Sequence, residues 1–184
     1  MKMSINRFFV SAVVAGFLAG FSGLAGTVAS AESFPDLPTV QNVNLERYMG
    51  KWYEIAALPQ VFQQGCFATA ANYSLRKNGT VQVINTCNKG SVDGPVTTAK
   101  GKAWVVDRKT NAKLKVSFQW PFAGDYWILA LDNDYTYALV GTPDRKSLWI
   151  LARTPVYEQS VVDGLLNAAD WYGFDTAAMN WTVH

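Results

Sequence analysis

Apolar and polar residues alternate most regularly along residues 113–120. Leu114, Val116, Phe118 and Trp120 occupy every second position there, separated by lysine, serine and glutamine. This period of two is typical of a strand with one buried face and one face in water. Runs rich in Val, Ile, Tyr, Trp and Thr, bounded by turn residues at short intervals, predict seven further strands, over residues 51–58, 66–76, 80–88, 97–107, 125–132, 135–141 and 147–153.

The period of the pattern changes after residue 154. Thr154 and Pro155 can begin a helix, and apolar residues then recur at three- and four-residue spacing through about Trp171, at Val161, Val162, Leu165, Leu166 and Ala169. This spacing predicts an amphipathic helix, which Gly164 weakens slightly. Residues 178–183 can form a short extended piece that returns to the edge of the sheet.

Eight consecutive strands followed by one helix predict an all-β fold. We expect an eight-stranded antiparallel up-and-down β-barrel with one C-terminal α-helix packed outside, because closing the sheet removes the exposed strand edges. A barrel of eight strands encloses a space for side chains or for one small ligand. Whether that space is filled decides what the protein can bind.

The first residues predict export. Lys2 and Arg7 precede an apolar run over 8–24, and residues 28–31 read Val-Ala-Ser-Ala, with small residues where a signal peptidase cleaves. We expect a signal peptide over 1–31, cleaved after Ala31, and a single domain over 32–184 in the periplasm or secreted. An uncleaved membrane anchor is the alternative, but glycines interrupt the apolar run. This stretch contains no cysteine, so we do not expect a lipid anchor.

Net charge argues against nucleic-acid binding. The chain has 16 basic and 14 acidic residues, and without Lys2 and Arg7 the exported part is formally neutral. A nucleic-acid-binding protein would normally show a basic patch. A neutral chain also gives little electrostatic steering toward a charged ligand.

Cys66 and Cys87 are the two cysteines, and both lie in the exported part. An oxidising compartment favours one disulfide between them. A two-residue turn at Asn78 and Gly79 would leave the cysteines two positions off on each strand, so the bridge requires a longer turn or a bulge near Gly65. The one histidine is His184, the last residue, so we expect neither a metal site nor a cofactor.

Three stretches together resemble the three signatures of the lipocalin family. Residues 44–56 read Asn-Leu-Glu-Arg-Tyr-Met-Gly-Lys-Trp-Tyr-Glu-Ile-Ala, residues 130–140 read Ala-Leu-Asp-Asn-Asp-Tyr-Thr-Tyr-Ala-Leu-Val, and residues 149–155 read Trp-Ile-Leu-Ala-Arg-Thr-Pro. The resemblance covers nearly all of residues 42–184 and is greatest to the bacterial lipocalin and apolipoprotein D branch.

The resemblance implies a calyx that is closed at one end and open at the other to an apolar ligand. In the family, the tryptophan of the first signature lies at the closed end and the arginine of the third packs across it, which implies that Trp52 and Arg153 form the barrel floor. The alternation of strand 147–153 agrees, since Trp149 and Arg153 share one face. The resemblance also implies that Tyr73, Asn85, Tyr126 and Trp149 line the pocket.

Aromatic residues are frequent, with 7 Trp, 8 Tyr and 10 Phe in the chain. Aromatic side chains also fill ordinary cores, but within a barrel they can form a lining for an acyl chain or a fused-ring lipid. The expected lining from the strand pattern consists of Phe118, Trp120, Tyr126, Tyr137 and Trp149.

We therefore expect an exported lipocalin that binds, stores or transports a small hydrophobic ligand, such as a fatty acid or lysophospholipid, without catalysis. It would act as a monomer or weak homodimer, and the bacterial relatives suggest membrane maintenance or a stress response. One alternative is a lipocalin-fold isomerase or synthase with Cys66 as nucleophile, but no histidine is available as its base and carboxylates such as Asp132, Asp134 and Asp144 fall in turns. Another is an interaction module whose apolar loop 120–127 touches a membrane or protein transiently.

Overall fold

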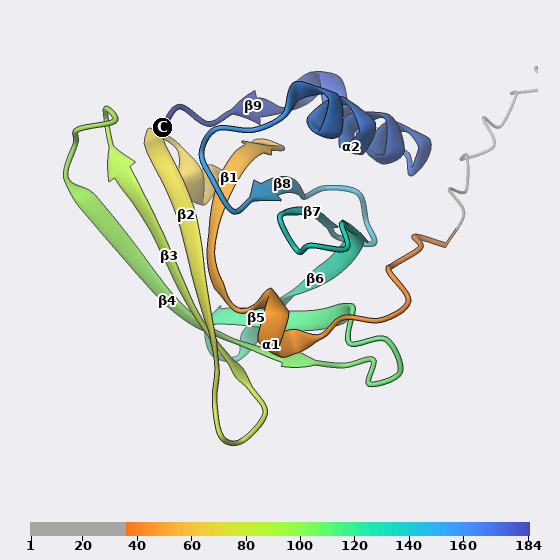
Figure 1. Cartoon of the computed structure of the whole chain (residues 1–184). Coiled ribbons are helices and arrows are strands. Elements are labelled where there is room, and N and C mark those ends of the chain that lie inside the picture. The colour runs from red at the N-terminus through yellow and green to blue at the C-terminus, as the bar shows by residue number, and fades with distance from the viewer. Residues whose placement is uncertain (1–35) are drawn as a thin grey trace, which may run out of the picture. The chain divides into compact units, whose positions relative to one another are not determined.

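The computed structural model of the chain describes residues 36–184, so the predicted signal segment lies outside the described residues. Eight antiparallel strands form the barrel (Figure 1): β1 Gly50–Ala57, β2 Cys66–Leu75, β3 Val81–Lys89, β4 Val96–Val105, β5 Lys113–Gln119, β6 Phe122–Leu131, β7 Tyr137–Gly141 and β8 Leu148–Ala152. Each strand pairs with the next, and β1 closes the ring because it pairs with both β8 and β2. The predicted barrel with one C-terminal helix is confirmed.

Short helices and one further strand complete the described part of the chain. The helices are α1 Leu45–Tyr48 and α2 Gln159–Trp171, with 3-10 turns η1 Val61–Gln63 and η2 Thr176–Ala178. The C-terminal extended piece is β9 Asn180–Trp181, which pairs with the end of β1. In this part of the chain, no helix combines the length and the apolar character needed to cross a membrane.

The barrel has two different ends, which we call the floor and the mouth. At the floor, where β1 begins, α1 and the preceding chain cross the barrel, and the amide of Val43 donates to the carbonyl of Thr110 at 2.8 Å. The mouth, where β1 ends, is surrounded by the loops at 58–65, 90–95, 120–121 and 142–147. The β2–β3 and β3–β4 hairpins therefore lie at opposite ends of the barrel (Figure 1).

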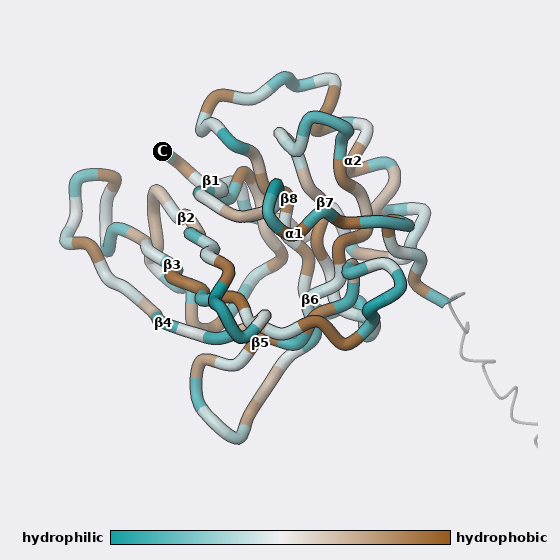
Figure 2. Tube along the Cα trace, turned by 60° about the horizontal axis from the view of Figure 1, so that its bottom comes forward, coloured by the Kyte–Doolittle hydropathy of each residue, from teal (hydrophilic) through white to brown (hydrophobic). Residues whose placement is uncertain are grey.

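Two hydrophobic layers hold these elements together. Outside the barrel, Val162 and Ala169 of α2 are buried in one cluster with Leu139 of β7 and Ile150 of β8. Inside the floor half, a second cluster contains the fully buried Trp52 of β1. Figure 2 shows hydrophobic and hydrophilic residues mixed along the barrel strands, as expected where the two faces of a strand have different neighbours.

Cys66 and Cys87 form a disulfide between β2 and β3, as predicted. Cys66 lies opposite Lys89, and the β2–β3 ladder shifts between Phe67 and Ala70. Ala68, inside this bulge, has a φ of 47°. The ladder thus departs from a two-residue turn both at the turn, where Leu75 lies opposite Val81, and at this bulge a few residues after Gly65. The two cysteine Cα atoms are 5.4 Å apart.

Candidate functional site

A cavity of about 690 Å³ occupies the barrel from floor to mouth. This volume falls within the roughly 300–1,000 Å³ typical of small-molecule sites. Most of the side chains in its wall are aliphatic or aromatic, and neighbouring strands of the barrel contribute them. Representative lining residues are Tyr73, Val83, Asn85, Ala99, Val116, Tyr126, Trp149 and Leu151.

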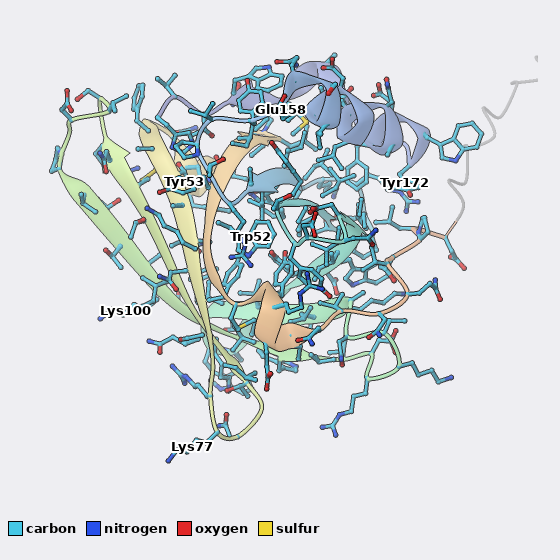
Figure 3. The ribbon with its side chains drawn as sticks, in the orientation of Figure 1. Trp52, Tyr53, Lys77, Lys100, Glu158 and Tyr172 are labelled. Atoms are coloured by element: carbon cyan, nitrogen blue, oxygen red, sulfur yellow. A yellow bond between two sulfur atoms is a disulfide. The ribbon has the colours of Figure 1, made fainter. Side chains whose placement is uncertain are left out.

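The floor is built around Trp52. Its side chain is fully buried, and its indole nitrogen donates to the carbonyl of Tyr48 at 2.9 Å. Figure 3 shows Trp52 inside the barrel near α1. The guanidinium of Arg153 lies 3.8 Å from the centroid of the Trp52 ring, a cation–π contact. Arg153 also donates hydrogen bonds to the carbonyl oxygens of Arg47, Tyr48, Lys51 and Tyr135.

Arg153 therefore joins α1, β1 and the β6–β7 turn across the closed end. Gly50 begins β1 with a φ of 94°, a conformation that favours glycine. A Cβ at this position would meet the Arg153 guanidinium at 3.3 Å. The glycine two residues before Trp52 thus serves both the backbone turn and the close packing of the arginine.

Three tyrosines form a hydroxyl cluster above the floor. The hydroxyl of Tyr126 lies 2.8 Å from that of Tyr48 and 3.2 Å from that of Tyr73. Burial raises the pKa of Tyr73 to about 12 and also raises the pKa values of Tyr48 and Tyr126. All three hydroxyls therefore stay neutral near pH 7. Two contacts use two of their three O–H donors, so one donor is left for a carbonyl, hydroxyl or other acceptor in the cavity.

Asn85 contributes a second polar group to the cavity wall. Its Oδ1 is buried and has no hydrogen-bond partner among the described residues. Asn85 lies opposite Ala71 on β2 and Ala99 on β4, so its side chain stands between two small residues. A buried acceptor without a partner costs about 1–3 kcal/mol, and a ligand hydroxyl could satisfy it.

Five of the seven predicted ligand contacts lie in the wall of this cavity: Tyr73, Asn85, Phe118, Tyr126 and Trp149. Phe118 stands near the mouth and is partly exposed. Trp149 and Leu151 face the interior from β8, while Leu148 and Ile150 face the α2 side.

Trp120 and Tyr137 lie outside the lining, contrary to the strand-pattern prediction. β5 ends at Gln119, so Trp120 falls in the β5–β6 turn and its side chain is 79% exposed. On β7, Ala138 and Val140 face the interior, which places Tyr137 on the opposite face with the α2 cluster. The Tyr137 hydroxyl accepts a hydrogen bond from the amide of Glu158 at 2.9 Å, ahead of α2.

Several polar residues of the cavity were not expected from the sequence, among them Tyr48 of the hydroxyl cluster and Glu54 of β1. Tyr48 lies on a helix of 4 residues, which is too short to show a helical period. Glu54 had a usable signal, because it follows Trp52 by two residues and two residues along a strand share a face. No group of His, Cys, Asp and Glu between residues 36 and 184 is arranged to hold a metal ion.

Comparison with known proteins agrees with this geometry. Residues 43–184 match a family model described as a Lipocalin-like domain. The chain is 42% identical to the outer membrane lipoprotein Blc of Escherichia coli K12 over 142 residues, which cover 77% of this chain and 80% of Blc. It is 34% identical to mouse apolipoprotein D over 181 residues, covering 90% of this chain and 92% of that protein.

A solved structure shows the same fold at lower sequence identity. Insecticyanin from the tobacco hornworm Manduca sexta superposes with a TM-score of 0.66 at 22% identity, covering 83% of this chain and 86% of insecticyanin. At this identity the likeness supports the fold of the chain and nothing further.

Proposed function

The chain belongs to the lipocalin family, and we propose that it binds, stores or transports a small hydrophobic ligand in its barrel without covalent chemistry. The cavity of about 690 Å³ carries this proposal, because it runs from the hydroxyl cluster at the floor to the mouth and is walled mainly by apolar side chains. Burying an acyl chain there gains roughly 0.8 kcal/mol per methylene before ordering costs.

A single-chain lipid, such as a fatty acid or lysophospholipid, is the ligand class that we propose. The long apolar wall suits the chain, while the spare tyrosine donor and the free Oδ1 of Asn85 suit a polar group with both an acceptor and a donor. Tyr73, Asn85, Phe118, Tyr126 and Trp149 are the proposed ligand contacts. The cavity is complete within one chain, so a monomer or weak homodimer is sufficient.

We propose export to the periplasm or the exterior, on the basis of the signal-like residues 1–31 and the similarity to an outer membrane lipoprotein. A role in membrane maintenance or a stress response is also part of the proposal, and the similarity to an outer membrane lipoprotein supports the link to a membrane.

The direct test is to purify the exported protein under native conditions, extract it with organic solvent and analyse the extract by mass spectrometry. We expect a single-chain lipid in near-stoichiometric amount, absent from the extract of an unrelated exported protein purified in parallel. Delipidated protein should then change its tryptophan fluorescence when a fatty acid or lysophospholipid is added, because Trp149 lies in the cavity wall. An empty extract together with unchanged fluorescence would contradict the carrier function.

A catalytic role through Cys66 has less support. The Cys66 sulfur is bonded to Cys87, so it is not a free thiolate. The side chain of Asp132 accepts hydrogen bonds from the amides of Thr136 and Tyr137. These hydrogen bonds give the carboxylate a structural role in the turn.

A second candidate function is transient contact with a lipid surface through the mouth loops. Val61 and Phe62 of the β1–β2 loop are 85% and 70% exposed, and Trp120 and Phe122 at the β5–β6 turn are 79% and 73% exposed. Residues 58–65 and 118–124 contain no charged side chain, so no charge would be desolvated on contact. Liposome flotation with neutral phosphatidylcholine vesicles tests it: the ligand-free protein should float, and Phe62→Ser/Trp120→Ser should not. Failure of the unaltered protein to float would contradict it.

A further inference from the structure

Glu54 lies in the cavity wall and plays no part in the function proposed so far. It follows Trp52 by two residues on β1, is 8% exposed and lines the cavity between floor and mouth. The β1–β2 ladder ends at Tyr53, opposite Ala70, and beyond this point β1 pairs with β9 instead. The carboxylate therefore stands where the two strands separate, beside the cavity.

The hydrogen-bond partners of this carboxylate are neutral. One oxygen accepts from the side-chain amide of Gln63 at 2.6 Å, and the other accepts from the hydroxyl of Thr182 at 2.8 Å. The ring of His184 is nearby, but its nitrogen contacts the backbone oxygen of Glu54, at 2.7 Å. In the part of the chain that the structure describes, the ion pair present is Lys115 with Asp125, so no Lys or Arg pairs with Glu54.

A buried carboxylate without a cation is costly to a fold. Burial raises the pKa of Glu54, and the hydrogen bonds from Gln63 and Thr182, with the nearby His184, offset this only in part. A carboxylate has about four acceptor sites, and the two hydrogen bonds leave capacity for further donors. A hydrophobic residue or a glutamine at this position would cost the fold less free energy to bury. The charged side chain is therefore better explained by an interaction with a ligand in the cavity.

We infer that Glu54 is a specificity residue that binds a protonated amine at the polar end of the ligand, while the apolar body lies along the cavity wall. The inference rests on the proposed function and narrows its ligand class from fatty acids and lysophospholipids to single-chain lipids that bear an amine, with fatty acids as weaker ligands. An ammonium group supplies both the missing countercharge and several N–H donors, which makes the contact a charge-assisted hydrogen bond. A ligand carboxylate at the same position would meet a like charge.

Three ligands of equal chain length test this inference by isothermal titration calorimetry at pH 7: dodecylamine, dodecanol and dodecanoate. The delipidated protein should bind dodecylamine about tenfold to a hundredfold more tightly than dodecanol, the range expected for one charge-assisted hydrogen bond, and dodecanoate most weakly. Glu54→Gln should remove most of the amine preference and leave the affinity for dodecanol nearly unchanged.

Thr182→Val provides the matched control, because it removes one hydrogen bond to Glu54 and keeps the charge. If Glu54 only fastens the C-terminal segment, Thr182→Val would reduce the amine preference as much as Glu54→Gln does, and that result would overturn the inference. Equal affinities of the unaltered protein for dodecylamine and dodecanol would overturn it as well. Binding of dodecanol separates the two proposals, since a protein that binds none of the three ligands contradicts the carrier function itself.

Discussion

Trp52 connects local sequence to the closed end of the barrel. Its indole lies under the Arg153 guanidinium and is hydrogen-bonded to Tyr48, a residue of the hydroxyl cluster. These contacts make Trp52 part of the floor on which the cavity rests. The side chain is not among those that line the cavity.

Trp52→Ala should lower the free energy of unfolding by about 3–5 kcal/mol, as a large-to-small change in a packed core. Trp171→Ala is the matched control, because the Trp171 side chain is 85% exposed and its removal should change stability by less than about 0.5 kcal/mol. Urea denaturation of both variants measures the difference. Equal effects in the two variants would show that Trp52 is not a packed floor residue.

Glu54 should make stability depend on pH in a direction opposite to that of ordinary surface carboxylates. Its pKa in the folded protein is raised above the ordinary 4.5. The folded state therefore holds the proton more tightly, and the contribution of Glu54 to stability is fully present below pH 4.5 and is lost as pH rises through the raised value. Tyr73 stays neutral throughout this range, since its pKa is about 12.

Glu54→Gln should consequently be more stable than the unaltered protein at pH 7, with the gap closing as pH falls toward 4.5. Urea denaturation of both proteins across this range measures the gap, and contributions from titrating groups that do not interact with Glu54 cancel in the difference. If Glu54→Gln is instead less stable than the unaltered protein at pH 7, and this deficit shrinks as pH falls, the pKa of Glu54 is lowered in the folded protein. That result would contradict this prediction.

At the level of elements, alternation found the strand over 113–120, and runs of Val, Ile, Tyr, Trp and Thr bounded by turn residues found the other seven barrel strands. Alternation failed to assign the faces where it is interrupted. The ladder between β5 and β6 shifts between Val116 and Gln119, so Trp120, two residues beyond Phe118, leaves the lining. Tyr137 was misassigned because both faces of β7 are buried and hydropathy cannot separate them.

The site was predictable to a similar extent. Trp52, Arg153 and the cavity contacts on β2, β3, β6 and β8 followed from motifs. Tyr48 did not, since it depends on a short helix crossing the floor. The place of Glu54 in the wall had a local signal in its spacing from Trp52, but its contact with the C-terminal segment had none. Such contacts join residues far apart in the sequence, and no local pattern encodes them.

Replacement by alanine should change stability in opposite directions at two glycines, one in α2 and one in β7. Gly164 lies inside α2, and a Cβ there would meet no atom within 4 Å, so Gly164→Ala should raise the free energy of unfolding by about 0.5–1 kcal/mol. At Gly141 of β7, a Cβ would lie 2.7 Å from the Phe174 ring. Gly141→Ala should therefore lower stability by about 1–3 kcal/mol through overpacking.

Thermal and urea unfolding measure the change in the free energy of unfolding for each glycine variant, and the chemical change is the same in both. Because each adds one methyl group, the comparison separates a Cβ that enters open space at Gly164 from one that meets the Phe174 ring at Gly141. A stabilising Gly141→Ala would show that the packing of Phe174 against β7 is looser than described.

For the whole molecule, the cavity that allows a ligand to bind also reduces the packing of side chains in the core. Packed side chains such as Trp52 close the floor, whereas a space of about 690 Å³ extends from the floor to the mouth. Side chains around an unfilled space lack partner atoms on one side, so the ligand-free barrel gives up contacts that a filled core would make. Stability without ligand and affinity for ligand should therefore trade against each other at positions in the wall.

Ala99→Leu tests this trade-off. Ala99 lines the cavity opposite Asn85 and is exposed to it. The added methyl and methylene groups should stabilise the ligand-free protein by about 1–2 kcal/mol, at roughly 0.8 kcal/mol for each carbon that becomes buried. They should also weaken dodecanol binding by about tenfold, since they occupy space that the ligand needs. Ala177→Leu, at an exposed position in η2, is the matched control and should change neither quantity. Urea denaturation and calorimetry measure the two effects, and a variant that binds dodecanol as tightly as before would show that the ligand does not occupy this part of the barrel.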